Sequence, residues 1–175
     1  CIRKVRGWDL GAGGDPTEGV LIGDRGPGIV PRYVVLDCIT HVGPPHEVHA
    51  LVKATAIADG PDVVIRIPQD PGQAGKDQAL TYSRELAGYT VRSKPVTGDK
   101  VVRAGPLSSQ VGARNVGLVR GPWTPGFVGQ LHAFPDTKRD DKVDAAADAF
   151  SKLAAFPDAA APRPRTRPHA PSWGF

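Results

Sequence analysis

Cysteine, methionine and long apolar runs are scarce or absent in this chain of 175 residues. Its two cysteines, Cys1 and Cys38, are too few for a disulfide framework or a zinc motif, which favours a reducing compartment. No apolar run approaches the roughly 20 residues that cross a bilayer, and no signal peptide is visible, so we predict no membrane partner. The chain has no methionine and enters a strand-like pattern directly after Cys1. We therefore expect a fragment of a longer protein, with a trimmed chain as the alternative.

A phosphate-binding loop of the form Gly-x-x-x-x-Gly-Lys-Ser/Thr is also absent, so this chain carries no ATPase motor of that type. What is present is enough apolar material for one core, because 40% of the residues are hydrophobic. The net charge of +4 is a mild basic excess. It permits a polyanionic partner without requiring one.

The order of elements predicts an α/β fold in one domain over residues 1–156. Three strand-like runs at 2–9, 18–24 and 32–39 are separated by short Gly- and Pro-rich stretches, which suits an antiparallel meander. The later elements alternate: a helix over 46–58, a strand over 62–67, a helix over 73–87, a strand over 89–96, a helix over 100–112, a strand over 116–120, and helices over 125–133 and 141–155. We expect a mixed sheet, a meander followed by parallel strands, with helices on both faces. Residues 157–175, with five prolines, predict a disordered basic tail.

Carboxylates stand at three element ends that are far apart in the chain. Asp9 closes the first strand, Asp70 follows the strand at 62–67, and Asp140-Asp141 opens the last helix. Mg²⁺ prefers oxygen ligands, and two such ions about 3.5–4 Å apart can stabilise both oxygens of a phosphoryl displacement. The pattern therefore predicts a metal-dependent nuclease.

Each acid also has a structural explanation. Asp9 and Asp70 lie in turn-like sequence, and an aspartate at a helix start is a common N-cap. Two adjacent aspartates exceed what a cap needs, and a cation would relieve their repulsion. Asp144 lies three residues beyond Asp141; for it we favour a capping or solvated role over that of a peripheral ligand.

A more specific signal comes from four motifs in order. They are Gly7-Trp8-Asp9-Leu10 with the segment up to Leu21, the run Ile65–Lys76, Thr97-Gly98-Asp99-Lys100 with Arg103 and Pro106, and Asp140-Asp141-Lys142-Val143-Asp144. Together they resemble the nuclease domain of phage terminase large subunits over about residues 5–156.

That resemblance implies a ribonuclease H-like fold and an endonuclease that uses two Mg²⁺ or Mn²⁺ ions. Its substrate would be double-stranded concatemeric phage DNA, cut during genome packaging in the bacterial host cytoplasm. The implied partners are an ATPase motor domain of the full-length protein, a small terminase subunit and a portal. The implied catalytic metal ligands are Asp9, Asp70 and Asp141, with Asp140 assisting. The family often has a histidine just before the double aspartate, where this chain has Arg139, so no histidine role is supported there.

Three basic side chains within the matched motifs, Lys76, Lys100 and Arg103, are candidates for DNA phosphate contacts. Ordinary solvated surface charge is the alternative. His46 and His49 have the spacing of a helical metal pair, but no third ligand is apparent, so surface histidines are favoured.

Three other functions stay open. The chain could be a non-catalytic DNA-binding module, another ribonuclease H-like nuclease such as a resolvase, or a prophage remnant that keeps only the fold. Divalent-dependent cleavage would separate the first and third of these from a nuclease.

Overall fold

A computed structural model describes residues 3–11, 14–95 and 97–156, so the predicted tail at 157–175 lies outside the described residues. Within them, six strands form one sheet in the order β5-β4-β1-β2-β3-β6. The strands are β1 (Arg3–Asp9), β2 (Thr17–Asp24), β3 (Tyr33–His41), β4 (Val63–Gln69), β5 (Thr90–Pro95) and β6 (Val116–Leu118).

The sheet is mixed, as predicted. Strands β1, β2 and β3 form the antiparallel meander, β4 and β5 add in parallel beside β1, and β6 adds in parallel beside β3. Every strand except β2 therefore points the same way. As a result, the carboxyl ends of five strands meet at one edge of the sheet.

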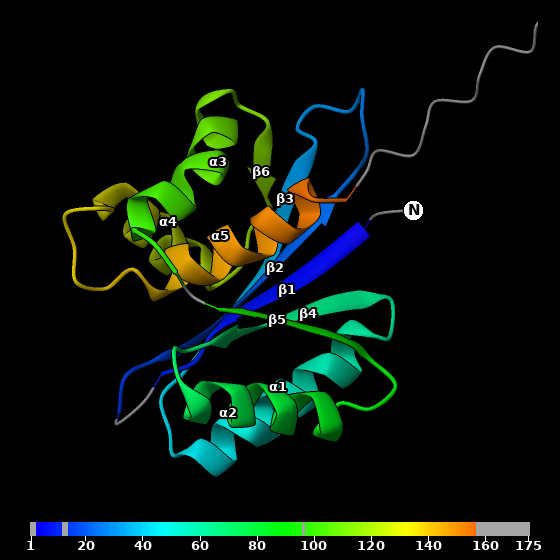
Figure 1. Cartoon of the computed structure of the whole chain (residues 1–175). Coiled ribbons are helices and arrows are strands. Elements are labelled where there is room, and N and C mark those ends of the chain that lie inside the picture. Colours follow the sequence, from blue (N-terminus) through cyan, green and yellow to red (C-terminus); the bar gives the residue numbers. More distant parts are fainter. Residues whose placement is uncertain (1–2, 12–13, 96, 157–175) are drawn as a thin grey trace, which may run out of the picture.

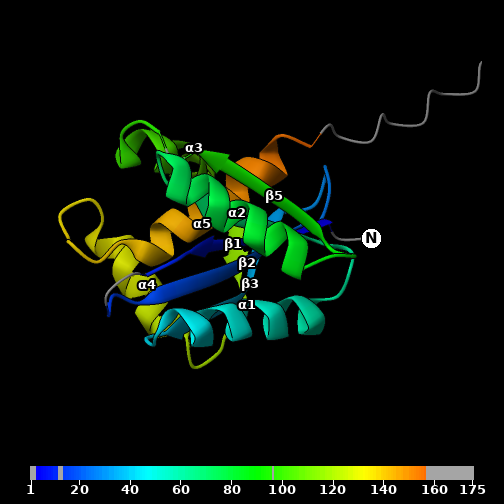
Figure 2. The ribbon, with the colours of Figure 1, turned by 60° about the horizontal axis from the view of Figure 1, so that its bottom comes forward.

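Five helices within the described residues cover both faces of this sheet, again as predicted. They are α1 (Pro45–Asp59), α2 (Gln73–Glu85), α3 (Lys100–Gly112), α4 (Thr124–Ala133) and α5 (Asp141–Ala154). Figure 1 shows α1 and α2 on one side of the sheet and α3, α4 and α5 on the other. Figure 2 shows α2 beside the edge strand β5. No helix of the described residues is both long and apolar enough to cross a membrane.

Helix α5 lies directly on β1 and β2 because the contact surface is made of small side chains. Ala145, Ala146 and Ala149 are fully buried in the core between α5 and the sheet. Gly7 of β1 faces them, and a Cβ there would collide with the carbonyl oxygen of Ala145 and lie 3.0 Å from the Ala149 Cβ. A side chain at this position would force the helix away from the sheet. The close packing therefore sets the distance between α5 and β1.

The opposite face of β1 belongs to a second core. Trp8 is 2% exposed and packs with Val52 of α1, Ile65 of β4 and Tyr82 of α2. Successive side chains of a strand point to opposite faces, so Trp8 points toward α1 and α2 while Asp9 points toward α5. The alternation along β1 thus places a carboxylate on the α5 side at the strand's last position.

Candidate metal and DNA site

The acids predicted from the sequence leave the sheet at the same edge. Asp9 is the last residue of β1 and Asp70 directly follows β4. These strands are parallel neighbours, in register from Lys4 with Val63 to Gly7 with Arg66. Because α5 lies across β1 and begins at Asp141, its first turn reaches this edge as well.

Asp9 lies at the centre of a group of carboxylates. Burial raises the pKa of Asp9 to about 7, and four nearby carboxylates add to the rise in the order Asp144, Asp141, Asp140 and Asp70. Like charges held together in a partly buried place disfavour ionisation, and a bound cation offsets that penalty. Asp9 thus interacts electrostatically with the three other acids of the sequence prediction and with Asp144.

The first turn of α5 gives its acids different environments. Asp140 precedes the helix, and its backbone carbonyl accepts the N–H groups of Val143 at 2.8 Å and Asp144 at 3.0 Å. Its side chain, which is almost completely buried, pairs with Lys100 of α3. Asp141, whose pKa is raised chiefly by burial, and Asp144 are three residues apart and share one side of the helix.

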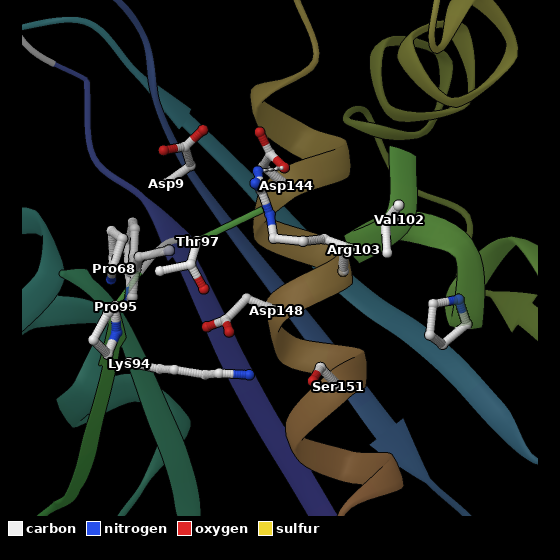
Figure 3. Close-up of a pocket in the computed structure, with 13 residues that line it drawn as sticks. Asp9, Pro68, Lys94, Pro95, Thr97, Val102, Arg103, Asp144, Asp148 and Ser151 are labelled. Atoms are coloured by element: carbon white, nitrogen blue, oxygen red, sulfur yellow. Dashed lines mark hydrogen bonds and ion pairs between the residues drawn. The ribbon is translucent and has the colours of Figure 1, made fainter. Parts of the chain in front are cut away.

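A pocket of about 250 Å³ opens beside Asp9. Figure 3 shows Asp9 and Asp144 at one end of it, with Lys94 reaching across from β5 toward α5. Arg103 of α3 also lines the pocket and donates to Asp144 at 2.7 Å. The pocket therefore combines acids from two elements with basic side chains from two others.

The three basic residues proposed from the sequence have distinct positions. Lys100 and Arg103 lie at the site, because each is paired with an acid of the α5 first turn. The hydrogen bond to Asp140 raises the pKa of Lys100. Lys76 is exposed on the first turn of α2, the helix that follows Asp70 along the chain.

Sequence reasoning missed three charged side chains of the pocket, Asp144, Lys94 and Asp148, the last of which is paired with Arg66 of β4. Asp144 was assigned to capping or solvent, yet among the neighbouring carboxylates it contributes most to the raised pKa of Asp9. Its spacing from Asp141, one helical turn, was the available signal. Lys94 was not singled out at all, and its place on one face of the edge strand, two residues from Arg92, was the weak pattern that indicated it.

Other chemistry-bearing residues lie elsewhere or are already engaged. His46 is exposed, and His49 makes a 3.0 Å contact with Glu85. Cys38 is a buried free thiol, and burial raises its pKa to about 12, which makes it inert at neutral pH. Trp123 is partly buried and packs against the core near α5.

The donor set matches a hard divalent cation in chemical type. Carboxylate oxygens are the ligands that Mg²⁺ and Mn²⁺ prefer, and here they come from β1, the end of β4 and α5. Within residues 3–11, 14–95 and 97–156, no three Asp, Glu, His or Cys side chains already stand where they could hold one ion. Asp140 and Asp144 are instead turned toward Lys100 and Arg103. The backbone thus supplies the convergence of acids, and the side chains are paired with local cations.

Three solved structures are similar to this chain. The nuclease domain of the large terminase of bacteriophage SPP1, solved with bound Mn, has the same fold, with a TM-score of 0.57 at 14% identity over 86% of each chain. A fowlpox virus resolvase in complex with Holliday junction DNA is 8% identical, with a TM-score of 0.49 over 88% of this chain and 97% of its own. RuvC of T. thermophilus in complex with a Holliday junction substrate is 11% identical, with a TM-score of 0.46 over 87% and 96%.

The resemblance inferred from the sequence motifs, and the ribonuclease H-like fold that it implies, are confirmed. A search of curated protein sequences finds no match. Residues 6–156 match the family described as the terminase RNaseH-like domain. The chain therefore belongs to the terminase ribonuclease H-like domain family.

Proposed function

We propose that this chain is a divalent-metal-dependent endonuclease that hydrolyses phosphodiester bonds of double-stranded DNA. The observation that carries the proposal is the convergence of carboxylates from β1, β4 and α5 around Asp9. Such a concentration of like charge is unfavourable unless cations neutralise it. Membership of the terminase family and the fold shared with the Mn-bound SPP1 nuclease domain support the same conclusion.

Asp9, Asp70 and Asp141 are the proposed catalytic ligands, and the position of Asp144 adds it to this set. Bound Mg²⁺ or Mn²⁺ would supply an activated water and stabilise the leaving oxygen. Asp140 assists in a different way, because its carbonyl caps α5 and its carboxylate holds Lys100. The chain's own task is to hold the acids at one edge and to orient the scissile phosphate against them.

The pocket beside Asp9 is the proposed place for the DNA strand. Lys94 and Arg103 line it and would pair with phosphate oxygens, while Thr97 offers a hydroxyl. Arg103 and Lys100 are now paired with Asp144 and Asp140. A metal ion bound by Asp144 would free Arg103 for DNA, which couples metal loading to substrate binding, while Lys100 stays paired with Asp140. Lys76, exposed at the same edge, remains a proposed outer contact.

The wider role follows from the family. We propose that the chain cuts concatemeric phage DNA during packaging in the bacterial host cytoplasm. In that assembly it would work with an ATPase motor domain, a small terminase subunit and a portal. The SPP1 relative is itself the nuclease domain of a large terminase.

Plasmid cleavage tests the activity. We expect the protein to nick or linearise supercoiled plasmid with Mn²⁺ or Mg²⁺, to stop in EDTA, and to lose cleavage in Asp70→Ala. Asp62→Ala is the matched control, because Asp62 is an exposed acid just before the opposite end of the same strand. Full cleavage by folded Asp70→Ala would refute the assignment.

The same assay separates the other functions. DNA binding without metal-dependent cleavage would indicate a non-catalytic module or a remnant. Preferential cutting of a four-way junction over a linear duplex would indicate a resolvase.

A further inference from the structure

A row of polar side chains continues from Asp9 across the sheet. In the strand register, Asp9 of β1 stands opposite Glu18 of β2, and Glu18 stands opposite Thr40 of β3. Paired positions of neighbouring strands point to the same face, so all three side chains face α5. Glu18 is only 1% exposed, which is unusual for a carboxylate.

The partner of Glu18 comes from the first turn of α5. The Lys142 ammonium donates to Glu18 Oε1 and, at 2.8 Å, to Thr40 Oγ1. The Thr40 hydroxyl in turn donates to Glu18 Oε2 at 2.7 Å. The Lys142 backbone N–H donates to Gln130 Oε1 of α4 at 3.0 Å. We call Lys142, Glu18 and Thr40 the Lys142 network.

Stability alone does not explain a buried ion pair at this place. Removing two charges from water carries a desolvation penalty that can exceed their attraction, and apolar replacements often stabilise a protein as well or better. A buried pair can instead specify one geometry, since its hydrogen bonds have fixed directions.

The first turn of α5 is where such a geometric constraint matters. Near its first turn, α5 meets the sheet through the small side chains of Ala145, Ala146 and Ala149, whereas its large buried side chains, Phe150 and Leu153, lie further along the helix. Lys142 lies between Asp141 and Asp144 in the chain, and its partner Glu18 is the cross-strand neighbour of Asp9. A displacement of this turn would move Asp141 and Asp144 relative to Asp9.

We propose that the Lys142 network is a positioning device that sets divalent-metal affinity by holding the first turn of α5 in register with the end of β1. The inference rests on the proposed function, since it assumes that the acids around Asp9 bind Mg²⁺ or Mn²⁺. It adds that residues that bind no metal themselves determine how well the acids converge. Because Lys142 and Glu18 neutralise one another, the network acts through geometry and leaves the local net charge unchanged.

The double variant Glu18→Gln/Lys142→Met tests this proposal, because it removes both charges and nearly keeps both volumes. Mn²⁺ binding is measured by titration calorimetry on the folded protein without DNA. We expect roughly 10- to 100-fold weaker binding, the range seen when supporting partners of metal ligands are lost. Unchanged binding would overturn the proposal. Tighter binding would also overturn it, since it would show that the lysine acts as a competing cation.

A second variant tests the network without removing a charge. Thr40→Val removes one hydroxyl from the network without touching a charge, and should weaken Mn²⁺ binding by a few-fold in the same direction. Its unchanged binding would count against the network even if the double variant failed to fold.

The control is Arg6→Met/Asp59→Asn, which breaks the 2.8 Å contacts of Arg6 with Asp59 and with Asp37, away from the α5 side of β1. It should lower the thermal midpoint and leave Mn²⁺ affinity unchanged. Absence of Mn²⁺ binding in the unaltered protein would refute the proposed function itself, which distinguishes the two failures.

Discussion

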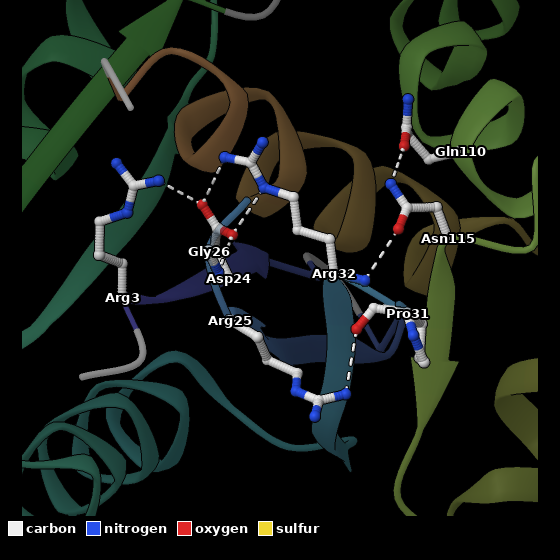
Figure 4. Close-up of polar contacts among 8 residues, drawn as sticks. All are labelled: Arg3, Asp24, Arg25, Gly26, Pro31, Arg32, Gln110 and Asn115. Carbon is white, nitrogen blue, oxygen red and sulfur yellow. Dashed lines mark hydrogen bonds and ion pairs between the residues drawn. The ribbon is translucent and has the colours of Figure 1, made fainter. Parts of the chain in front are cut away.

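Two aspartates at opposite ends of the β1–β2 hairpin have opposite electrostatic environments. Asp24, the last residue of β2, stands opposite Arg3, while Asp9 at the other end stands opposite Glu18. Asp24 is buried, which raises its pKa, but hydrogen bonds from Arg32, the Gly26 N–H and Arg3 outweigh burial and lower the pKa to about 2. Figure 4 shows the two arginines converging on its carboxylate. Asp9 is surrounded by acids, and its pKa is raised to about 7.

The comparison distinguishes a carboxylate that stabilises the fold, Asp24, from a carboxylate of the candidate site, Asp9. At the Asp24 end, two guanidinium groups and a backbone N–H satisfy one carboxylate, so its charge stabilises the hairpin. At the Asp9 end, acids are held together against their mutual repulsion. A fold retains that kind of local instability where a site needs it.

The largest effect we expect is on activity, at the Asp9 end. Asp9→Asn keeps the shape of the side chain but removes the charge at the centre of the acid group. Metal-dependent plasmid cleavage should fall about a thousandfold or more, on the scale of losing a principal electrostatic group in an active site. Without metal, at pH 7.5, the variant should be as stable as the parent or more stable, because repulsion is relieved. Initial rates and urea unfolding measure the two quantities; a variant that cleaves normally would contradict the placement of Asp9.

In EDTA, Asp9 and Asp24 should change the stability of the protein in two different pH ranges. The pKa of Asp9 is about 7 in the fold against an ordinary 3.8, so the folded state binds the proton more tightly. Its contribution to stability is complete below about pH 4 and is lost as the pH rises through 7, by up to about 4 kcal/mol. The pKa of Asp24 is lowered, so its contribution is present above 3.8 and is lost as the pH falls through about 2.

Urea unfolding over a pH series measures both slopes. In Asp9→Asn the fall in stability between pH 4 and 7 should be smaller than in the parent. The loss of stability at acid pH, which we assign to Asp24, should remain. An identical pH profile in the variant and the parent would contradict the raised pKa of Asp9.

Within the acid group, substitution of Asp144 should reduce cleavage more than substitution of Asp140. Asp144 lines the pocket and contributes more than Asp140 to the raised pKa of Asp9. Asp140 caps α5 through its backbone carbonyl, which a side-chain substitution leaves in place. We expect Asp144→Asn to lower cleavage more than 100-fold, as for a ligand, and Asp140→Asn about tenfold, at the low end of the range for a supporting group. The reverse order in measured rates would restore the ranking suggested by the sequence.

Asp24→Asn should lower the free energy of unfolding and leave the cleavage activity unchanged. An amide accepts hydrogen bonds less strongly than a carboxylate and lacks its charge, so Arg3 and Arg32 lose their common partner. The lowered pKa corresponds to about 2 kcal/mol of stability at neutral pH. Urea unfolding at pH 7 measures this loss, and the cleavage rate per folded molecule should not change. A rate that fell together with stability would show that the two ends of the hairpin are coupled.

The sequence predicted the elements well because their periodicities are strong. The β-branched run at 62–67 is typical of a buried strand, and β4 is found there; the predicted helix 100–112 coincides with α3. The pairing of β6 with β3 had no local signal, because three residues carry no information about which edge they join. The motifs that resemble phage terminase nucleases supplied the family, which the match over residues 6–156 confirms.

The site was predicted less completely, since its geometry depends on contacts distant in the chain. Asp9, Asp70 and Asp141 could be named as element ends that meet at one edge. The place of Asp144 depends on how closely α5 approaches β1 at Gly7, which no local pattern encodes. The Lys142 network joins Glu18 to a lysine 124 residues away, and only the fold brings them together.

The smallest effect we expect is on DNA binding. The test removes one positively charged side chain from each end of the β1–β2 hairpin. Lys94 lines the pocket beside Asp9, whereas Arg25 is exposed next to Asp24 at the other end of the hairpin. If the DNA strand lies at the acid edge, Lys94→Ala should weaken binding a few-fold. It should also lower the slope of log affinity against log salt by about one, since one phosphate contact is lost. Arg25→Ala removes an equal charge and should leave that slope unchanged. Measurements in the Asp9→Asn background keep the DNA intact, and an unchanged slope for Lys94→Ala would mean that DNA does not follow the acid edge.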